Sequence, residues 1–187
     1  ATAYSFTVSA YDAAGNTSAQ SSALAVTTSA ASGGGSCGTT WYVDSSVSSS
    51  GNGCSWGTAW KSFSNIVWMS IKPGDTIYIS GGASTQTYNE TLTIGASGST
   101  AGRISIRTGQ DAGHNGTVII DGQYAQNSGI VISGRSYVNI SGQVGSGAAQ
   151  QMRVTHAKLA GIDISGSTTN LDIGYLDVSA NGNAADT

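Results

Sequence analysis

Hydrophobic residues alternate with polar ones through most of residues 76–179. Short runs in which every second residue is Val, Ile, Leu or Met are each closed by Gly, Ser or Asn. An alternation of period two is typical of β-strands with one buried face. We predict strands at residues 77–80, 92–94, 104–107, 118–121, 130–133, 138–141, 152–155, 162–165, 171–173 and 176–179.

The pattern differs over residues 59–70, which follow a short predicted strand at 41–43. Trp60, Phe63, Ile66 and Val67 recur at spacings of three and four residues, and the breaker sequence KPGD comes next at 72–75. This spacing predicts one amphipathic α-helix, placed where an N-terminal cap would lie.

The segments after residue 128 repeat. GIVISGRS at 129–136 and VNIS at 138–141 match GIDISGST at 161–168 and LDIG at 171–174, and MRVT at 152–155 corresponds to LDVS at 176–179. A unit of three short strands buries its apolar row only by stacking on the next unit, which predicts a parallel β-helix. The predicted inward residues are Ile130, Ile132, Val138, Ile140, Met152, Val154, Ile162, Ile164, Leu171, Ile173, Leu176 and Val178.

The chain before residue 37 has a different organisation. Two β-like runs at 4–10 and 23–28 are joined by turn-forming residues, which predicts a hairpin, and SAASGGGS at 29–36 has the composition of a flexible linker. We therefore expect a hairpin at 1–28, a linker at 29–36 and the β-helix at 37–187. Because strand-like alternation begins at once and no cap follows residue 179, we expect a piece of a longer protein.

Composition narrows the function classes. Only 9% of the 187 residues are charged, the formal net charge is −3, and Gly, Ser and Thr occupy 27, 30 and 20 positions. Coiled coils need far more Glu, Lys and Arg, and nucleic-acid-binding domains need clustered basic residues. No apolar run reaches the roughly 18 residues of a membrane-spanning helix. The sequence predicts an all-β protein with no nucleic-acid partner and no membrane span.

Two cysteines, Cys37 and Cys54, flank a segment rich in Gly and Ser. We interpret them as a disulfide that closes a poorly ordered loop, with two free thiols as the alternative. The two histidines lack zinc-ligand spacing. A disulfide favours an oxidising, extracellular setting.

The N-terminal hairpin resembles a known module. YSFTVSAYDAAGNTSAQSSALAVTT is similar to the last two strands of a fibronectin type III domain, in its aromatic alternation and its AYDAAGN turn. The similarity covers less than a third of such a domain. It implies that the remaining strands lie before residue 1 or come from another surface.

Residues 40–179 resemble the secreted right-handed parallel β-helix proteins of the pectate-lyase-like superfamily. The similar segments are WYVDSSVSSSGNGCSWGTAWKSF, KPGDTIYISGG, TYNETLTI, HNGTVIIDG and the GI-IS repeats. The resemblance implies an all-β right-handed solenoid with an N-terminal capping helix. It does not fix the activity, because the superfamily includes lyases, hydrolases, epimerases, adhesins and tailspikes, and no catalytic motif of the family matches.

Few charged residues lie in the repeats. Superposing the repeats pairs Asn139 with Asp172, and Arg153 with Asp177, on neighbouring strands. Such strands stack about 4.8 Å apart, so each pair is expected to be in contact.

The candidate substrate-binding residues are Arg153, His156, Asp172 and Asp177. In an acidic-sugar site, Arg153 or Lys158 would neutralise a uronate carboxylate and His156 would remove the adjacent proton. Calcium held by carboxylates is the alternative to the arginine. The competing interpretation is that Arg153 and Asp177 form an ordinary exposed pair and that the aspartates only keep the outer face soluble.

Two further features have alternative interpretations. Trp41, Trp56, Trp60 and Trp68 are assigned to the core, with a sugar-stacking platform as the alternative. The segment DAGHNG at 111–116 is interpreted as a corner turn, with a metal or sugar contact as the alternative.

Two hypotheses of function follow. The first is a fragment of a secreted, multidomain bacterial protein that binds or degrades acidic polysaccharide through its β-helix, as a lyase or glycoside hydrolase if it is an enzyme. The second is a non-enzymatic structural or adhesive surface protein, such as a filament subunit, in which the β-helix is a rigid spacer. Its hairpin would then mediate self-association by completing a neighbour's sheet.

Overall fold

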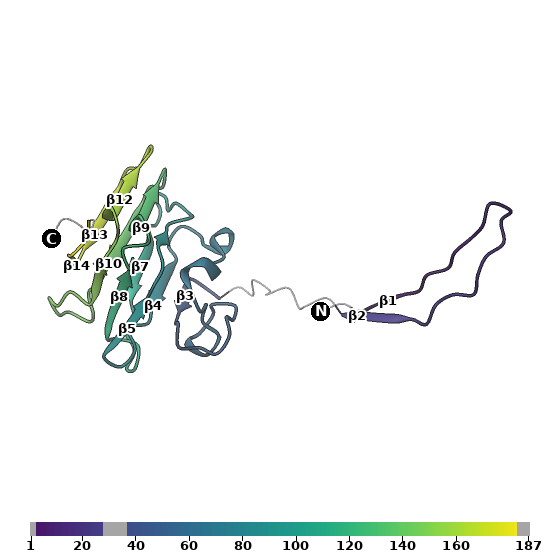
Figure 1. Ribbon diagram of the computed structural model, residues 1–187. Coiled ribbons are helices and arrows are strands. Elements are labelled where there is room, and N and C mark those ends of the chain that lie inside the picture. The colour runs from purple at the N-terminus through teal and green to yellow at the C-terminus, as the bar shows by residue number, and fades with distance from the viewer. Residues whose placement is uncertain (1–2, 28–36, 183–187) are drawn as a thin grey trace. The chain divides into compact units, whose positions relative to one another are not determined.

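The computed structural model describes residues 3–27 and 37–182. The chain divides into two compact units, Ala1–Gly33 and Gly34–Thr187. Figure 1 shows a hairpin and a stack of strands, and each is described by itself below. The predicted linker at 29–36 lies outside the described residues, as do residues 183–187.

The N-terminal unit is a two-stranded antiparallel ribbon of β1 (Ala3–Phe6) and β2 (Leu24–Thr27). Both strands are shorter than predicted. Beyond Phe6 the backbone pairing continues in part, because Ser21 N donates to Val8 O and Ser18 N donates to Ala10 O, each at 2.8 Å. The reciprocal bonds go to seryl hydroxyls: Ser21 Oγ accepts from Val8 N at 3.1 Å, and Ser18 Oγ accepts from Ala10 N at 3.0 Å. The serine hydroxyls therefore replace half of the backbone bonds, and regular pairing ends early.

The second unit is an all-β parallel solenoid of about four turns. Its first sheet contains, in spatial order, β13 (Leu171–Gly174), β10 (Val138–Ser141), β7 (Ile104–Thr108), β4 (Thr76–Ile79) and β3 (Thr40–Val43). Its second sheet contains β14 (Leu176–Val178), β11 (Met152–Thr155), β8 (Thr117–Asp121) and β5 (Thr85–Tyr88). Its third sheet contains β12 (Ala160–Ser165), β9 (Ser128–Ser133) and β6 (Leu92–Thr93).

The parallel solenoid predicted from the repeats is confirmed, and each predicted strand has a counterpart. One strand, β5 (TQTY), escaped prediction because its sequence has no apolar alternation. Thr85 and Thr87 are exposed, Gln86 is half-buried among polar partners, and only Tyr88 enters the core.

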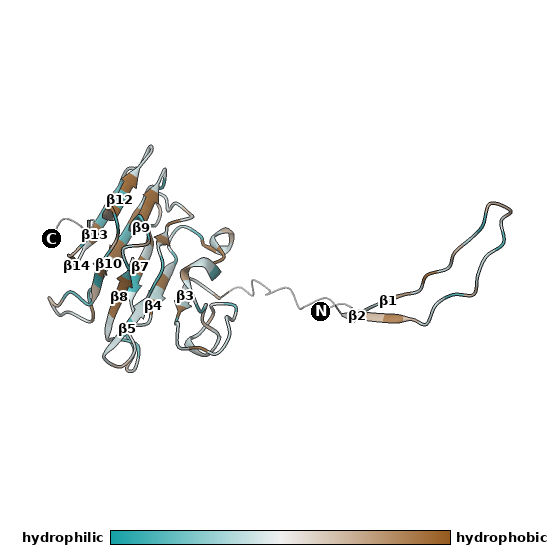
Figure 2. Ribbon diagram, in the orientation of Figure 1, coloured by the Kyte–Doolittle hydropathy of each residue, from teal (hydrophilic) through white to brown (hydrophobic). Residues whose placement is uncertain are grey.

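Inward Ile, Val, Leu and Met side chains fill the solenoid, and Figure 2 shows hydrophobic residues concentrated in its strands. The first six predicted inward residues, from Ile130 to Val154, are fully buried. In the last described coil, Ile162 and Leu171 are only partly buried. Ile164 is 52% exposed and Val178 is 46% exposed. No described strand packs on the outer side of this coil, so its residues lack half of their neighbours.

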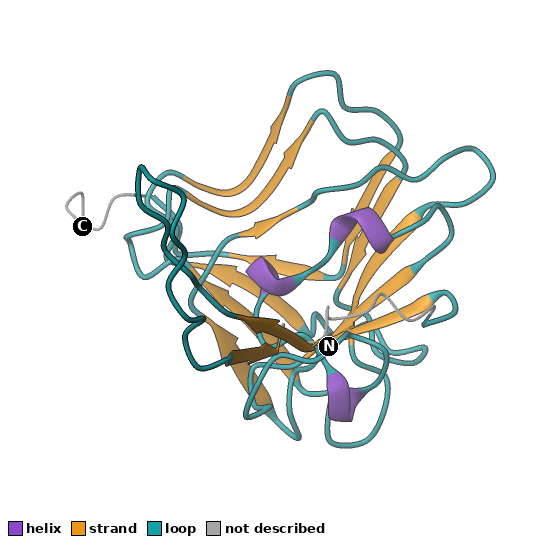
Figure 3. Cartoon of the chain, turned by 90° about the vertical axis from the view of Figure 1, so that its right-hand side faces the viewer, coloured by secondary structure: helices purple, strands orange, loops and turns teal. Residues whose placement is uncertain are grey.

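The α-helix predicted at residues 59–70 is wrong. The segment contains two short 3-10 turns, η2 (Phe63–Asn65) and η3 (Trp68–Ser70), and a third, η1 (Trp56–Thr58), comes just before it; all three are visible in Figure 3. Trp60 interrupts any helix because its backbone pairs with β3: its N–H donates to Tyr42 O at 2.9 Å, and its carbonyl accepts from Asp44 N at 2.8 Å.

Successive turns, rather than one helix, bring the apolar side chains of this segment inward. Phe63 and Ile66 are both buried in the core, and Trp60 stacks on Trp41 with ring centroids 5.2 Å apart. The spacing of three and four residues thus reports a buried face correctly but not the backbone that presents it. Within the described part of the chain, no helix is long and apolar enough to cross a membrane.

The predicted disulfide is confirmed between Cys37 and Cys54, whose Cα atoms lie 4.7 Å apart. Gly53 beside it has a φ of +80°, and a Cβ there would meet the Trp60 ring at 2.6 Å. Glycine is therefore required at this position by both backbone and packing.

Candidate functional site

The outward residues of the first sheet form two continuous rows across its five strands. Parallel pairing places one residue from each strand in each row. The first row contains Tyr42, Tyr78, Arg107, Ser141 and Gly174. The second row contains Thr40, Thr76, Ser105, Asn139 and Asp172.

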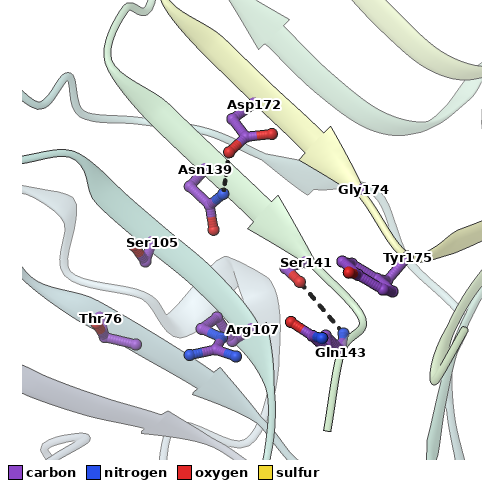
Figure 4. Close-up of a pocket in the computed structure, with 9 residues that line it drawn as sticks. All are labelled: Thr76, Ser105, Arg107, Asn139, Ser141, Gln143, Asp172, Gly174 and Tyr175. Carbon is purple, nitrogen blue, oxygen red and sulfur yellow. Dashed lines mark hydrogen bonds between the residues drawn. The ribbon is translucent and has the colours of Figure 1, made fainter. Parts of the chain in front are cut away.

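These rows border a shallow groove of about 290 Å³ that crosses β4, β7, β10 and β13. We call it the first-sheet groove. Figure 4 shows its side chains standing on the outer face of the strands. The lining residues are Thr76, Ser105, Arg107, Asn139, Ser141, Gln143, Asp172, Gly174 and Tyr175.

Arg107 is the one cation that lines this groove. Arg107 is half-buried, and in the described part of the chain no carboxylate lies within ion-pairing distance of its guanidinium. In β7, ISIRT, the alternation buries Ile104, Ile106 and Thr108 and so turns Ser105 and Arg107 outward. The strand therefore presents an unneutralised charge with five N–H donors in a planar fork, the geometry that matches a carboxylate.

The far side of the groove is polar and mostly uncharged. Asn139 Nδ2 donates to Asp172 Oδ2 at 3.1 Å, so the carboxylate is held by its neighbour on β10. Ser141 Oγ accepts from Gln143 N at 3.2 Å, which fixes the turn after β10. A Cβ added at Gly174 would meet nothing within 4 Å, so the floor there is open.

An aromatic cluster adjoins the groove beyond Arg107. Tyr78 is the register partner of Arg107, and its ring centroid lies 6.1 Å from that of Tyr42. Trp56 packs edge-on against Tyr42 at 4.6 Å and stacks on the His114 ring at 3.9 Å. Trp56 Nε1 donates to Asp111 Oδ2 at 2.7 Å. Burial raises the pKa of Tyr42, and the Asp111 carboxylate adds to the effect.

Asp44, Ser80 and His114 lie together behind this cluster, but they do not form a catalytic triad. His114 Nδ1 faces both Ser80 Oγ at 3.0 Å and Asp44 Oδ2 at 3.3 Å, whereas a triad needs the two partners on opposite ring nitrogens. Burial raises the pKa of Asp44, but hydrogen bonds from Gln86 and Ser46 and the charge of His114 outweigh it, so the pKa is lowered. Asp44, Ser80 and His114 therefore form a structural hydrogen-bond network.

The structure divides the predicted site residues between two sheets. Arg153 and Asp177 pair across β11 and β14 on the second sheet, with Nε 2.9 Å from Oδ2. His156, just after β11, has Nδ1 3.1 Å from an Asp121 oxygen. Asp172 lies on the first sheet, paired with Asn139 as predicted. The four residues therefore do not converge on one groove.

Arg107 was overlooked in the sequence although its strand was predicted. The signal was present: β7 pairs with β10, so the residue two positions after Ser105 had to share a row with Ser141. The strands of the earlier coils are spaced differently in sequence from those after residue 128, so the sequence repeats did not align β7 with β10. The aromatic neighbours were not linked to Arg107 either. Tyr42 lies in the strand predicted at 41–43, and Trp56 was assigned to the core with a sugar-stacking platform as the alternative, but only the fold places both beside Tyr78.

A second hollow of about 300 Å³ lies over η2, η3 and β6. Its lining residues are Phe63, Ser64, Ile66, Trp68, Thr91, Thr93 and Gly95, none of which is charged. It therefore has no group that selects an acidic ligand.

Among residues 3–27 and 37–182, no group of three or more His, Cys, Asp or Glu side chains is placed to hold a metal ion. The first-sheet groove instead provides one unneutralised guanidinium, neutral hydrogen-bonding side chains and an aromatic border. In comparisons with known proteins, no family model and no curated protein matches the chain.

Proposed function

We propose that the chain binds an acidic polysaccharide in the first-sheet groove, with a sugar carboxylate on Arg107. The observation that supports this most is that Arg107 is half-buried and its guanidinium has no anionic partner in the described part of the chain. A guanidinium gains most from a ligand carboxylate when it can make two parallel hydrogen bonds in a partly desolvated place.

The form of the groove favours an extended, hydroxylated ligand. Small-molecule sites are concave and mostly apolar, whereas this surface is shallow and lined mainly by polar residues across four strands. Four strands at about 4.8 Å spacing give a track of roughly 15 Å, long enough for several sugar units in a row. Residues 40–179 resemble the pectate-lyase-like superfamily, which includes polysaccharide lyases and glycoside hydrolases as well as adhesins, and this resemblance is consistent with the same class of ligand.

Affinity electrophoresis and calorimetry with polygalacturonate, alginate and hyaluronate test the proposal. The unit 37–187 in the full chain should bind at least one of these polymers, and Arg107→Gln should weaken that binding at least about tenfold. Arg153→Gln is the matched change on the second sheet. Loss of binding in Arg153→Gln but not in Arg107→Gln, or no binding to any acidic polymer, would reject the first-sheet groove.

Cleavage is a separate question from binding. β-Elimination would create an unsaturated sugar, whose ultraviolet absorbance rises as the reaction proceeds. The groove supplies the charge that acidifies the sugar proton, but its lining includes no histidine or lysine. The lining groups that could act as base are Asp172 on β13, which accepts from Asn139, and Tyr175, which follows β13; that strand is two strands from Arg107. We therefore propose binding without cleavage, and a time-dependent absorbance increase with any of the three polymers would contradict this.

One observation favours a structural or adhesive role as a second candidate. On the β1–β2 ribbon, Tyr4 pairs with Val26 and Phe6 with Leu24, and all four side chains are exposed by 41–65%. A two-stranded ribbon is marginally stable alone, so this apolar face favours association. Sedimentation velocity over a concentration series tests it: self-association should weaken in Phe6→Ser, and a monomer at all concentrations would rule it out.

A further inference from the structure

The positions of the charged side chains around the groove predict how charges should be spaced on its ligand. We infer that it selects polysaccharides in which a carboxylate-bearing sugar is flanked by uncharged sugars, over homopolymers with a carboxylate on every sugar. This rests on the proposed function and adds a charge pattern to it.

Carboxylates of the protein lie on both sides of Arg107. Asp172 is in the neighbouring row on β13, two strands away. At about 4.8 Å per strand, two strands correspond to roughly 10 Å across the sheet. On the opposite side, Asp111 is held beside the aromatic cluster by its hydrogen bond from Trp56 Nε1 at 2.7 Å. A ligand carboxylate placed over either flank would meet a charge of the same sign.

Arg103, a second cation, does not change that pattern. Arg103 precedes β7 and is not among the groove-lining residues. Its Nη1 donates to the Asn170 carbonyl at the start of β13. The charges of Arg103 and Arg107 are thus matched by those of Asp111 and Asp172, so these four groups together give no general attraction to a polyanion.

The flanks of Arg107 suit neutral sugar units. On one side, Tyr78 and Tyr42 offer half-buried rings whose faces suit the C–H side of an uncharged pyranose. On the other side, Asn139, Ser141 and Gln143 offer amides and a hydroxyl that match sugar hydroxyls. A ligand with one carboxylate on Arg107 and neutral sugars on either side thus matches the guanidinium, the aromatic rings and the polar side chains of this surface.

The size of the discrimination follows from Coulomb's law. Two carboxylates roughly 10 Å apart disfavour each other by about twofold in water and by about fifteenfold at an effective dielectric constant near 20. A ligand carboxylate over the Asp172 flank lies closer than the roughly 10 Å between Arg107 and Asp172, so these factors are lower bounds for that flank. A dense polyanion meets this repulsion on each flank, so the preference for sparse charge should lie between those limits or somewhat above. Added salt should reduce it.

One polymer backbone with graded charge gives a direct test. Polygalacturonate in which none, half or nearly all of the carboxylates are reduced to neutral galactose would be titrated into the full chain. Affinity per carboxylate should be highest for the half-reduced polymer, and hyaluronate, whose uronates alternate with neutral sugars, should also bind better than polygalacturonate. Affinity that rises steadily with charge density would overturn the inference while leaving the proposed function intact. No binding to any of these polymers would reject both.

A charge-neutralising variant tests whether the Asp172 carboxylate causes the preference for sparsely charged polymers. Asp172→Asn keeps an amide oxygen that can accept from Asn139, but it removes the flanking charge. It should shift the preference toward the fully charged polymer by roughly two- to fifteenfold. Asp163→Asn, on the third sheet, is the matched control and should leave the preference unchanged. An unchanged profile in Asp172→Asn, with thermal unfolding like that of the wild type, would also overturn the inference.

Discussion

Arg107 on β7 and Tyr78 on β4 are register partners on the outer face of one parallel sheet. The pairing places an unneutralised guanidinium next to a half-buried aromatic ring, at the border between a polar groove and an aromatic cluster. Charge, hydrogen bonding and an apolar ring face thereby adjoin on a surface made almost entirely of small polar residues.

Replacing Arg107 by lysine separates charge from geometry. Lysine keeps the positive charge but loses the planar fork that pairs with both carboxylate oxygens. Arg107→Lys should therefore bind an acidic polymer with an affinity between those of the wild type and Arg107→Gln, and with a stronger dependence on salt. Calorimetric titration at two salt concentrations measures this.

The stability of both Arg107 variants should stay within about 0.5 kcal/mol of the wild type, because no ion pair of the fold is removed. Wild-type affinity in Arg107→Gln would contradict the assignment of the carboxylate site.

Acid should destabilise the solenoid through Asp44. Its pKa lies below the ordinary value of 3.8, because hydrogen bonds from Gln86 and Ser46 and the charge of His114 outweigh the effect of burial. The ionised carboxylate therefore stabilises the fold fully above pH 3.8, and this stabilisation is lost as the pH falls through the lower folded-state pKa. Urea unfolding between pH 7 and pH 2 should show the loss.

Asp44→Asn is the control for that acid limb. It should be less stable than the wild type at neutral pH and should lose less stability on acidification. Asp44→Ala leaves the Ser46 N–H without its acceptor and removes one acceptor of the Gln86 amide, which still donates to Ser45 Oγ, and it should cost about 1–3 kcal/mol. Equal pH dependence in Asp44→Asn and the wild type would show that other carboxyl groups govern the acid limb.

Tyr88 should contribute mainly through its ring. The side chain is 2% exposed, its hydroxyl donates to Ser80 O at 2.9 Å, and its ring stacks on Phe63 at 4.8 Å. Burial raises the pKa of Tyr88, and the Asp44 carboxylate adds to the effect. Tyr88→Phe should cost about 1 kcal/mol for the lost hydrogen bond, whereas Tyr88→Ala should cost about 3–5 kcal/mol.

Denaturant unfolding of the two Tyr88 variants measures both costs. A larger loss in Tyr88→Phe than in Tyr88→Ala would mean that the polar contacts, and not the packing, dominate.

Reducing the disulfide should weaken the solenoid. Cys37 and Cys54 are separated by 17 positions, and closing a loop of that size is worth about 3 kcal/mol in the chain-entropy description. The double variant Cys37→Ala/Cys54→Ala should unfold at correspondingly lower denaturant concentration, and a reducing agent should lower the wild type to the same midpoint. A reductant effect of equal size on the double variant would show that the loss has another origin.

The repeats predicted the solenoid well because stacking imposes one rule on every coil. Aligning VNIS with LDIG placed Asn139 beside Asp172, and aligning MRVT with LDVS placed Arg153 beside Asp177; both pairs are neighbours in the structure. The burial of the inward residues was predicted correctly for the same reason, because each coil stacks on the next. Where a coil has no described neighbour on one side, as at Ile164, the rule predicts burial that does not occur.

Two features could not be predicted from local pattern. The spacing of Trp60, Phe63 and Ile66 fits a helix, but the backbone of Trp60 is already paired with β3, and only the tertiary structure reveals that partner. The candidate site depends on the same kind of information. Arg107 is a candidate binding residue because Tyr78 and Ser141 lie beside it. Both are far away in sequence and are adjacent only through the strand register.

The most direct test of the central claim is an amide NMR titration of the isotope-labelled chain with a short acidic oligosaccharide. Binding in the first-sheet groove should perturb the backbone amides around Thr76, Ser105, Arg107, Asn139 and Asp172, and Arg107→Gln should abolish those changes. Perturbations centred instead on Arg153, His156 and Asp177 of the second sheet, persisting in Arg107→Gln, would contradict the account.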